Sequence, residues 1–293
     1  MVSARADPAY PLVPFLSLDT VWFQVAGTIC NLRCTHCFIS CSPDNHSHGM
    51  MTLEEIRPRL EEAVRLGARD YYFTGGEPFM NREIFPILEA TLAVGPATVL
   101  TNGLLIDAPR VGRLRELSDG SRYSLDIRIS LDGYDPEAHD AIRGAGTFDR
   151  ALGAAVRLAD GGLNPVLTVT ETSPEIGCGP GRAAFLDRMR RAGLPRPRLK
   201  ILSMFHIGRE ADRSRAYQEC ESLQGHVLSR SQAEALQCSS SRMVTGRGVY
   251  VCPILVDRDE ARMGEGLEDT FREFSLTHSA CFTCHATGVT CRT

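Results

Sequence analysis

Residues 30–37 read Cys30-Asn31-Leu32-Arg33-Cys34-Thr35-His36-Cys37 and follow a short run rich in β-branched and aromatic residues. The three cysteines lie four and then three positions apart, so their thiolates can converge from one short loop on three corners of an iron–sulfur cluster. The motif offers no fourth ligand, which leaves one iron open. Cys41 is the alternative fourth ligand, and it would close a four-cysteine zinc site instead.

The cysteine content of the whole chain points to a second metal centre. The chain has 11 cysteines in 293 residues, and in a reducing compartment disulfides are a poor explanation for so many. Apart from the N-terminal group and Cys178, the other cysteines lie in the last quarter of the sequence: Cys220, Cys238, Cys252, Cys281, Cys284 and Cys291. Two separate groups imply two separate centres.

The overall composition is that of an ordinary globular protein, with 43% hydrophobic and 23% charged residues. Lys and Arg number 32 against 36 Asp and Glu, a net charge of −4 that argues against a nucleic-acid partner. No segment approaches the roughly 18 to 20 consecutive apolar residues of a membrane helix, and the N-terminus lacks the pattern of a signal peptide. We therefore expect a cytoplasmic protein without a membrane partner.

Short β-rich runs alternate with helical patterns between residues 20 and 206. The expected strands are residues 21–25, 71–74, 98–101, 125–131, 166–170 and 199–202, and the expected helices are residues 52–66, 82–93, 108–117, 136–160 in two pieces and 180–192. This alternation predicts an α/β fold with a parallel sheet. Six units are fewer than the eight of a closed barrel, which favours a partial (β/α)6 TIM-like barrel.

We expect three segments: an N-terminal extension (1–19), the partial barrel (20–206) and a small Cys-rich C-terminal domain (207–293). The fourth strand predicts what the barrel encloses. Its apolar residues alternate with Asp126, Arg128, Ser130 and Asp132. Because helices cover the outside of such a sheet, the polar row must face the interior. The interior therefore holds a polar ligand rather than a packed core.

Four motifs occur in order, each at the end of an expected strand: C-x-x-x-C-x-x-C, then Gly75-Gly76-Glu77-Pro78, Thr101-Asn102-Gly103 and Ser130-Leu131-Asp132-Gly133. Together they resemble the radical S-adenosylmethionine (SAM) enzymes over about residues 20 to 205. The ends of barrel strands are where α/β barrels build their sites. The resemblance implies that Cys30, Cys34 and Cys37 hold a [4Fe-4S] cluster whose open iron binds SAM, and that an electron from the cluster cleaves SAM to a 5′-deoxyadenosyl radical.

The resemblance also implies roles for the residues around SAM. His36 stands where the family usually has an aromatic ring near the adenine, although a core histidine is the alternative. Gly75 to Pro78 resembles the segment that receives the methionine ammonium group, and we expect its glycines to leave room for that approach. Glu77 is by analogy a positioning residue. Ser130, Asn102 and Arg143 are candidates for the ribose and carboxylate of SAM, with a helix-surface charge as the alternative for Arg143.

The C-terminal cysteines resemble the SPASM or twitch extension, which carries auxiliary [4Fe-4S] clusters in radical SAM enzymes. Residues 248–253 suggest a hairpin that presents Cys252, and a helix is expected around residues 267–274. The full SPASM pattern has more cysteines in a tighter terminal run. We therefore expect one auxiliary cluster, with zinc as the alternative metal and the following ligands, the last as a competitor: Cys238, Cys252, Cys281, Cys284 and Cys291.

Three cysteines remain, and we expect Cys41, Cys178 and Cys220 to be small buried side chains. Cys178 follows the fifth expected strand. It could therefore lie on the active rim and donate a hydrogen atom to a substrate radical, which makes it the candidate catalytic residue.

An auxiliary cluster that accepts one electron favours a two-electron oxidation. With only about 20 residues before the first strand, no leader-binding domain is expected, so we favour dehydrogenation of a small polar biosynthetic metabolite. The alternatives are a maturase of a ribosomal precursor peptide, an epimerase that uses Cys178, and a non-catalytic iron–sulfur or zinc scaffold. The resemblance further implies an electron donor such as flavodoxin or ferredoxin.

Overall fold

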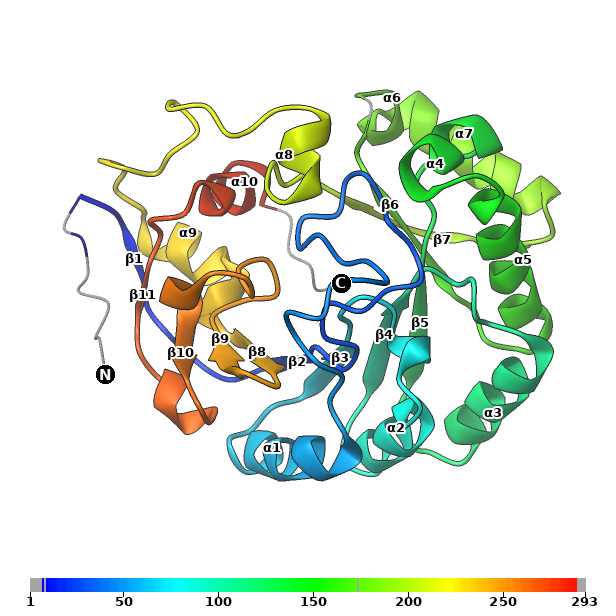
Figure 1. The fold of residues 1–293 in the computed structure, drawn as a ribbon, viewed down its shortest axis with the longest axis horizontal. Helices are drawn as coiled ribbons and strands as arrows, with labels where there is room; N and C mark the ends of the chain where they lie inside the picture. The colour runs from blue at the N-terminus through cyan, green and yellow to red at the C-terminus, as the bar shows by residue number, and fades with distance from the viewer. Residues whose placement is uncertain (1–6, 8, 173, 289–293) are drawn as a thin grey trace.

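The fold is an open, curved sheet covered on its outer side by helices (Figure 1). It is seen in a computed structural model, which describes residues 7, 9–172 and 174–288. The strands of the main sheet have the spatial order β10-β9-β8-β2-β3-β4-β5-β6-β7. Their bounds in chain order are β2 Thr20–Phe23, β3 Asp70–Phe73, β4 Ala97–Thr101, β5 Leu125–Ser130, β6 Val166–Thr170, β7 Arg198–Leu202, β8 Ser241–Thr245, β9 Gly248–Tyr250 and β10 Arg262–Gly264.

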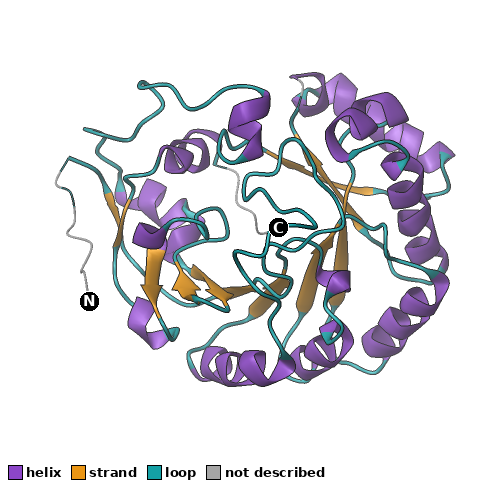
Figure 2. Ribbon diagram, in the orientation of Figure 1, coloured by secondary structure: helices purple, strands orange, loops and turns teal. Residues whose placement is uncertain are grey.

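Strands β2 to β7 are all parallel to their neighbours, and helices connect them. The helices and 3-10 turns of this part are α1 Leu53–Arg65, η1 Pro78–Met80, α2 Ile84–Leu92, α3 Ala108–Asp119, α4 Pro136–Arg143, α5 Thr147–Asp160, α6 Pro174–Gly177 and α7 Gly179–Arg191. The predicted α/β alternation and parallel sheet are therefore confirmed, with ends that differ by one or two residues at most elements. Figure 2 shows the strands as an arc with helices outside it and loops within it.

Local sequence explains how these elements begin. Thr52 caps α1 by accepting a hydrogen bond from the backbone N–H of Glu55 at 3.2 Å, and the Glu55 carboxylate accepts one from the N–H of Thr52 at 2.7 Å. This capping box satisfies two N–H groups that the helix itself leaves unpaired. Apolar side chains on the inner face of α1, such as Ile56 and Leu60, then pack on the outer face of the sheet.

The two faces of the sheet belong to different hydrophobic clusters. Outward residues such as Val21, Phe73, Val99 and Ile127 belong to one large apolar cluster with the helices. Inward residues alternate with them, and on β5 they include Arg128 and Ser130, which line a central cavity. The predicted polar row thus faces the interior of the arc.

The C-terminal segment extends the same sheet. Strand β8 pairs in parallel with β2, and β9 returns antiparallel to β8. The hairpin therefore spans residues 241–250 and begins before the expected 248–253, with Cys252 just after it. Its remaining elements are α8 Arg209–Arg213, α9 Arg230–Ala235, η2 Gln237–Ser239, η3 Asp259–Ala261, η4 Glu268–Thr270, β11 Phe274–Ser275 and α10 Ser279–Thr287. The N-terminal strand β1 (Leu12–Val13) pairs with β11. The sheet is therefore continuous across residue 206, where a domain boundary is expected.

The helix expected around residues 267–274 is wrong. That stretch forms the single turn η4 and then enters β11, because Phe274 pairs with Val13 near the N-terminus. The Thr270 hydroxyl donates to the carbonyl of Leu267 at 2.6 Å, which also closes the turn locally. A long-range strand pairing has overridden the local helical pattern.

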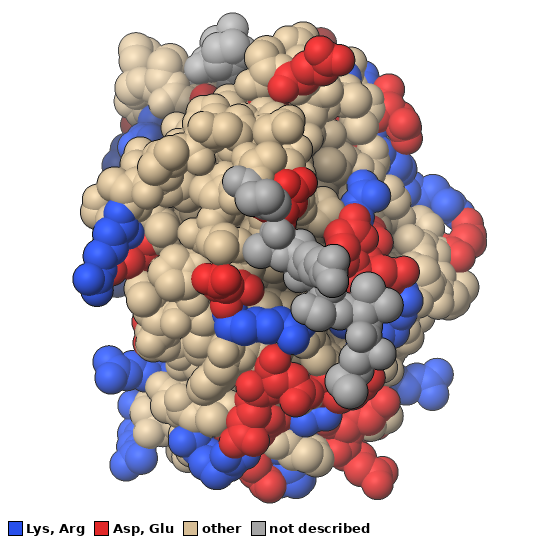
Figure 3. Space-filling view, turned by 90° about the vertical axis from the view of Figure 1, so that its left-hand side faces the viewer, with Lys and Arg blue, Asp and Glu red and all other residues tan. Residues whose placement is uncertain are grey.

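Charges of both signs are mixed on the face that carries β1 and β11. Figure 3 shows Arg side chains among Asp and Glu side chains there. The pairs include Arg65 with Glu268 and Arg262 with Glu265. Within the described part of the chain, none of the helices has the length and apolar character needed to span a bilayer.

Candidate active site and a second cysteine pocket

One cavity inside the arc collects most of the predicted cofactor residues. It is lined by the three cysteines of the N-terminal motif and by the ends of the parallel strands. The predicted residues that line it are Cys30, Cys34, Cys37, His36, Gly75, Gly76, Asn102, Ser130 and Arg143. Residues from four separate motifs, spread over more than 100 positions, therefore meet at one place.

The cysteine loop is held over this cavity by backbone hydrogen bonds. The N–H of Cys30 donates to the carbonyl of Ser42 at 3.1 Å, and the N–H of Thr35 donates to the carbonyl of Ile142 at 2.8 Å. Cys30 and Cys34 are buried. Burial raises the pKa of the Cys30 thiol to about 12 and also raises the pKa of Cys34. Thiolates at these positions therefore need a cationic partner, and the iron of a cluster supplies one.

Cys41 lies beside the motif and lines the same cavity. Its backbone N–H donates to the sulfur of Cys37 at 3.3 Å. A hydrogen bond from the Cys41 thiol lowers the pKa of Cys37. Cys41 is buried, as expected for a small structural side chain, and its position leaves open the alternative of a fourth thiolate ligand.

The glycine pair after β3 is required by the protein backbone. A Cβ on Gly76 would lie 1.9 Å from the carbonyl oxygen of Ile29, and Gly75 has a φ of +128°. The N–H of Gly76 donates to the carbonyl of Gly27 at 2.9 Å. The expectation that the glycines only leave room for a ligand is therefore incomplete, since the cysteine loop itself packs against them.

Glu77 and Pro78 do not line the cavity. The buried Glu77 carboxylate accepts hydrogen bonds from the Thr101 hydroxyl at 2.7 Å and from the N–H groups of Asn102 at 2.8 Å and Phe79 at 3.0 Å. Pro78 begins η1 and is buried. Glu77 thus joins the glycine segment to the end of β4, the geometry of a positioning residue.

The same connection places Asn102 against the cysteine loop. Its side-chain amide donates to the side-chain oxygen of Asn31 at 2.8 Å, and its nitrogen lies 3.8 Å from the Cys30 sulfur. Asn102 therefore lies close to a cluster ligand as well as lining the cavity.

A buried polar triad lies beside Cys34. The Asp132 carboxylate lies 2.6 Å from Nε of Arg143 and 2.8 Å from Nε2 of His36, and Nη1 of Arg143 lies 3.9 Å from the Cys34 sulfur. Burial alone would raise the pKa of Asp132, but Arg143 and His36 outweigh it and hold that pKa well below its usual range. Asp132 therefore stays ionised and fixes two predicted SAM-binding side chains.

Neither Asp132 nor Arg209 is among the predicted site residues. Asp132 closes the polar row of β5 and its motif, so a signal for it exists in the sequence. Arg209 lines the cavity, and its backbone N–H donates to the carbonyl of Cys37 at 3.1 Å while its guanidinium contacts the carbonyl of Cys41. No motif marks Arg209, because it reaches the cysteine loop from α8, more than 160 residues away.

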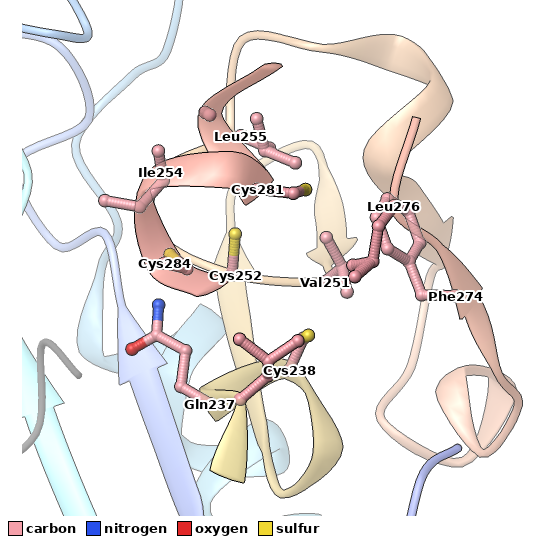
Figure 4. Close-up of a pocket in the computed structure, with 12 residues that line it drawn as sticks. Gln237, Cys238, Val251, Cys252, Ile254, Leu255, Phe274, Leu276, Cys281 and Cys284 are labelled. Carbon is pink, nitrogen blue, oxygen red and sulfur yellow. The ribbon is translucent and has the colours of Figure 1, made fainter. Parts of the chain in front are cut away.

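The C-terminal cysteines line a second, largely apolar pocket. Figure 4 shows Cys238, Cys252, Cys281 and Cys284 around it, on segments from η2, the end of the hairpin and α10. Burial, with smaller effects from Cys238 and Cys252, raises the pKa of Cys281 well above its ordinary value. Four thiols in a dry pocket suit a closed [4Fe-4S] cluster, in which each cysteine binds a different iron. Cys291, the predicted competitor, lies outside the described residues.

A single metal ion fits less directly. Among residues 7, 9–172 and 174–288, no three His, Cys, Asp or Glu side chains are close enough together to hold one ion.

The two cysteine groups flank one space. Pro253 and Ile254, directly after Cys252, line the central cavity, and Ile254 also lines the second pocket.

Cys178 lies away from both pockets. It is exposed, it is not among the cavity-lining residues, and its sulfur accepts a hydrogen bond from the N–H of Gly181 at 3.3 Å as the N-cap of α7. Cys220 is exposed as well. The expectation that these two cysteines are buried is wrong, because the chain places them on a helix end and in a surface loop.

Comparison with known proteins gives the family. The Radical SAM superfamily model matches residues 25–181, more than half of the chain. The mycofactocin maturase MftC of Mycobacterium ulcerans is 31% identical over 62% of this chain and 47% of its own length. The AdoMet-dependent heme synthase of Methanosarcina barkeri is 34% identical over 45% of this chain and 36% of its own length. The matched region thus spans less than half of these relatives.

Among solved structures, Streptococcus suis SuiB bound to its precursor peptide SuiA superposes with a TM-score of 0.66 and 15% identity, covering 88% of this chain and 65% of SuiB. This likeness concerns the fold. The family match extends from the end of β2 into α7, and it contains the cysteine loop, the glycine segment and the polar end of β5 that meet in the cavity. The chain belongs to the radical SAM superfamily, whose members bind S-adenosylmethionine and a [4Fe-4S] cluster.

Proposed function

We propose that this chain is an oxidoreductase that uses SAM to oxidise a peptide substrate in the central cavity, with a second [4Fe-4S] cluster at the C-terminal cysteines. The observation that carries the proposal is the shared space: Cys30, Cys34 and Cys37 line the cavity on one side, and Pro253 and Ile254, next to Cys252, line it on another. A substrate in this cavity lies between the two cysteine groups.

In this proposal Cys30, Cys34 and Cys37 hold the first cluster, which when loaded supplies the electron that converts SAM to a 5′-deoxyadenosyl radical. The main chain at Gly75 and Gly76 receives the methionine part of SAM. The cavity-lining side chains of His36, Asn102, Ser130 and Arg143 contact its adenine, ribose and carboxylate. Asp132 and Glu77 orient this set from buried positions.

The second cluster is held by Cys238, Cys252, Cys281 and Cys284, in a SPASM- or twitch-like domain of residues 207–293. The oxidation would balance as follows: the substrate carbon would give one hydrogen atom to the deoxyadenosyl radical, then one proton to solvent and one electron, for which a cluster at these four cysteines would supply the acceptor. The product lacks two hydrogen atoms. A flavodoxin or ferredoxin supplies the electrons that reduce the first cluster.

The choice of a peptide rests on the comparisons. MftC is by name a maturase. SuiB, whose fold this chain shares, is bound to the precursor peptide SuiA in its solved structure. Nothing in the names of MftC and SuiB supports the expected dehydrogenation of a small polar metabolite. The epimerase alternative loses its support too, because Cys178 does not line the cavity.

The test is an anaerobic assay of the reconstituted protein with SAM, dithionite and short peptides encoded beside its gene. We expect 5′-deoxyadenosine and a peptide that is lighter by two hydrogen atoms. The Cys37→Ala variant serves as the control that forms neither product. Absence of 5′-deoxyadenosine from protein that carries both clusters would favour the scaffold alternative, and 5′-deoxyadenosine with an unchanged peptide would contradict the proposed substrate.

A further inference from the structure

A fully buried arginine lies next to the second cysteine pocket. Arg242, on β8, has no exposed surface, and its guanidinium carbon lies 4.1 Å from the centre of the Phe15 ring. All five of its N–H groups have acceptors, and every acceptor is a backbone carbonyl. Nε contacts Thr270 at 3.3 Å, Nη1 contacts Cys238 and Ser241 at 2.7 Å each, and Nη2 contacts Thr270 at 2.9 Å and Arg272 at 3.4 Å.

These contacts satisfy hydrogen bonding but do not neutralise the charge. Among the described residues, no carboxylate forms an ion pair with Arg242. A buried guanidinium without a counter-charge is costly, and proteins tolerate it only where an anion is near. Carbonyl dipoles and the Phe15 ring offset part of that cost. The remainder calls for a negative group.

The candidates for that group are the cysteines of the second pocket. The Arg242 guanidinium is bonded to the backbone of Cys238. Its charge also acts on the thiols of Cys238 and Cys252. Four thiolates around a [4Fe-4S] core of charge +2 make a dianion, and one-electron reduction adds a further negative charge. A cation bonded to the backbone of Cys238 is therefore placed to stabilise the cluster most strongly in its reduced state.

We propose that Arg242 is the buried counter-cation of the second cluster and raises its reduction potential, so that the cluster accepts an electron more readily. The inference rests on the proposed function for the cluster itself. Arg242 acts through its positive charge and not by direct contact. Among the described residues, it makes no hydrogen bond to a cysteine sulfur and does not line the central cavity.

The test isolates the second cluster by removing the first with the triple substitution Cys30→Ala, Cys34→Ala and Cys37→Ala in the full chain. The potential is then measured by redox titration followed by electron paramagnetic resonance. In this background Arg242→Gln should lower the equilibrium constant for one-electron reduction by about tenfold, equal to about 59 mV. Arg242→Lys keeps the charge but cannot make five hydrogen bonds, and it should keep the potential near that of the parent. Arg272→Gln removes an exposed guanidinium from the same region and should leave the potential unchanged.

A purely structural role for Arg242 predicts another pattern, in which both substitutions weaken the fold and neither moves the potential selectively. If Arg242→Gln does not fold, the thermal unfolding of Arg242→Met is measured before and after the cluster is loaded with iron, in place of the redox titration. We expect cluster loading to stabilise the parent more than this variant. Equal stabilisation, or equal potentials in the Gln and Lys variants, overturns the inference while the cluster stands. Absence of any four-iron cluster from the triple variant overturns the proposed cluster and the inference together.

Discussion

The two cysteine groups differ in sequence spacing and in surroundings. The first lies within residues 30–37 and is bordered by Asp132, Arg143 and Arg209, which line or support a cavity with both polar and apolar walls. The second gathers cysteines from residues 238–284 into an apolar pocket, with Arg242 as its buried cation. A site that binds a charged ligand needs charged side chains in its lining to orient it, whereas a site that only exchanges electrons does not. In the proposed function, the first group admits a ligand and the second only exchanges electrons.

The strongest test of this comparison is whether three or four cysteines bind the first cluster. Cys37→Ala should abolish formation of 5′-deoxyadenosine and remove about four iron atoms per chain, because a three-cysteine site cannot spare a ligand. Cys41→Ala should retain the iron and the activity. Loss of iron in Cys41→Ala to the same extent as in Cys37→Ala would contradict the open site and favour a four-cysteine centre.

The second group should fail in a different way. Cys252→Ala should reduce the iron from about eight to about four atoms per chain. It should still cleave SAM to 5′-deoxyadenosine, because the first cluster is untouched, but it should not complete oxidation of a substrate. Iron analysis and product analysis by mass spectrometry measure both effects, and Cys220→Ala, which changes an exposed cysteine, is the matched control. Zinc in place of iron at this site would contradict the proposed electron acceptor, because zinc cannot be reduced there.

The contrast between the groups also explains what the sequence could predict. The strands and helices of the barrel follow from local alternation, and the first cysteines from a motif confined to eight residues. The pairing of β8 with β2 and of Phe274 with Val13 joins segments more than 200 residues apart, so no local pattern signals either. For the same reason, the sequence predicts His36 and Arg143 as site residues but not their shared partner Asp132. No sequence pattern marks Arg242.

Charge at the first site gives the next prediction. Asp132→Asn leaves Arg143 buried without its partner and should cost about 3–5 kcal/mol in the free energy of unfolding, measured by urea denaturation. Asp126→Asn, on β5 just before Asp132, breaks a half-exposed pair with Arg198 (2.8 Å) and should cost less than about 1 kcal/mol. Similar losses in both variants would mean that the triad contributes no more than a surface pair.

The pH dependence of the same pair has a definite sign. The pKa of Asp132 is depressed in the folded state, so its contribution is present above the unfolded pKa of about 4 and is lost as the pH falls below it. The stability difference between the parent and Asp132→Asn should therefore shrink as the pH is lowered from about 5 to about 2. A difference that stays constant over this range would show that folding does not depress the pKa of Asp132.

The smallest effect is expected where neither cysteine group is involved. Cys178 is exposed and caps α7 through its sulfur. Because serine is a better N-cap than most residues, Cys178→Ser should change the free energy of unfolding by less than about 0.5 kcal/mol. It should also leave 5′-deoxyadenosine and product formation intact. Retained SAM cleavage with a lost product in this variant would restore Cys178 as a hydrogen-atom donor, and it would then require the loop before α7 to reach the cavity during turnover.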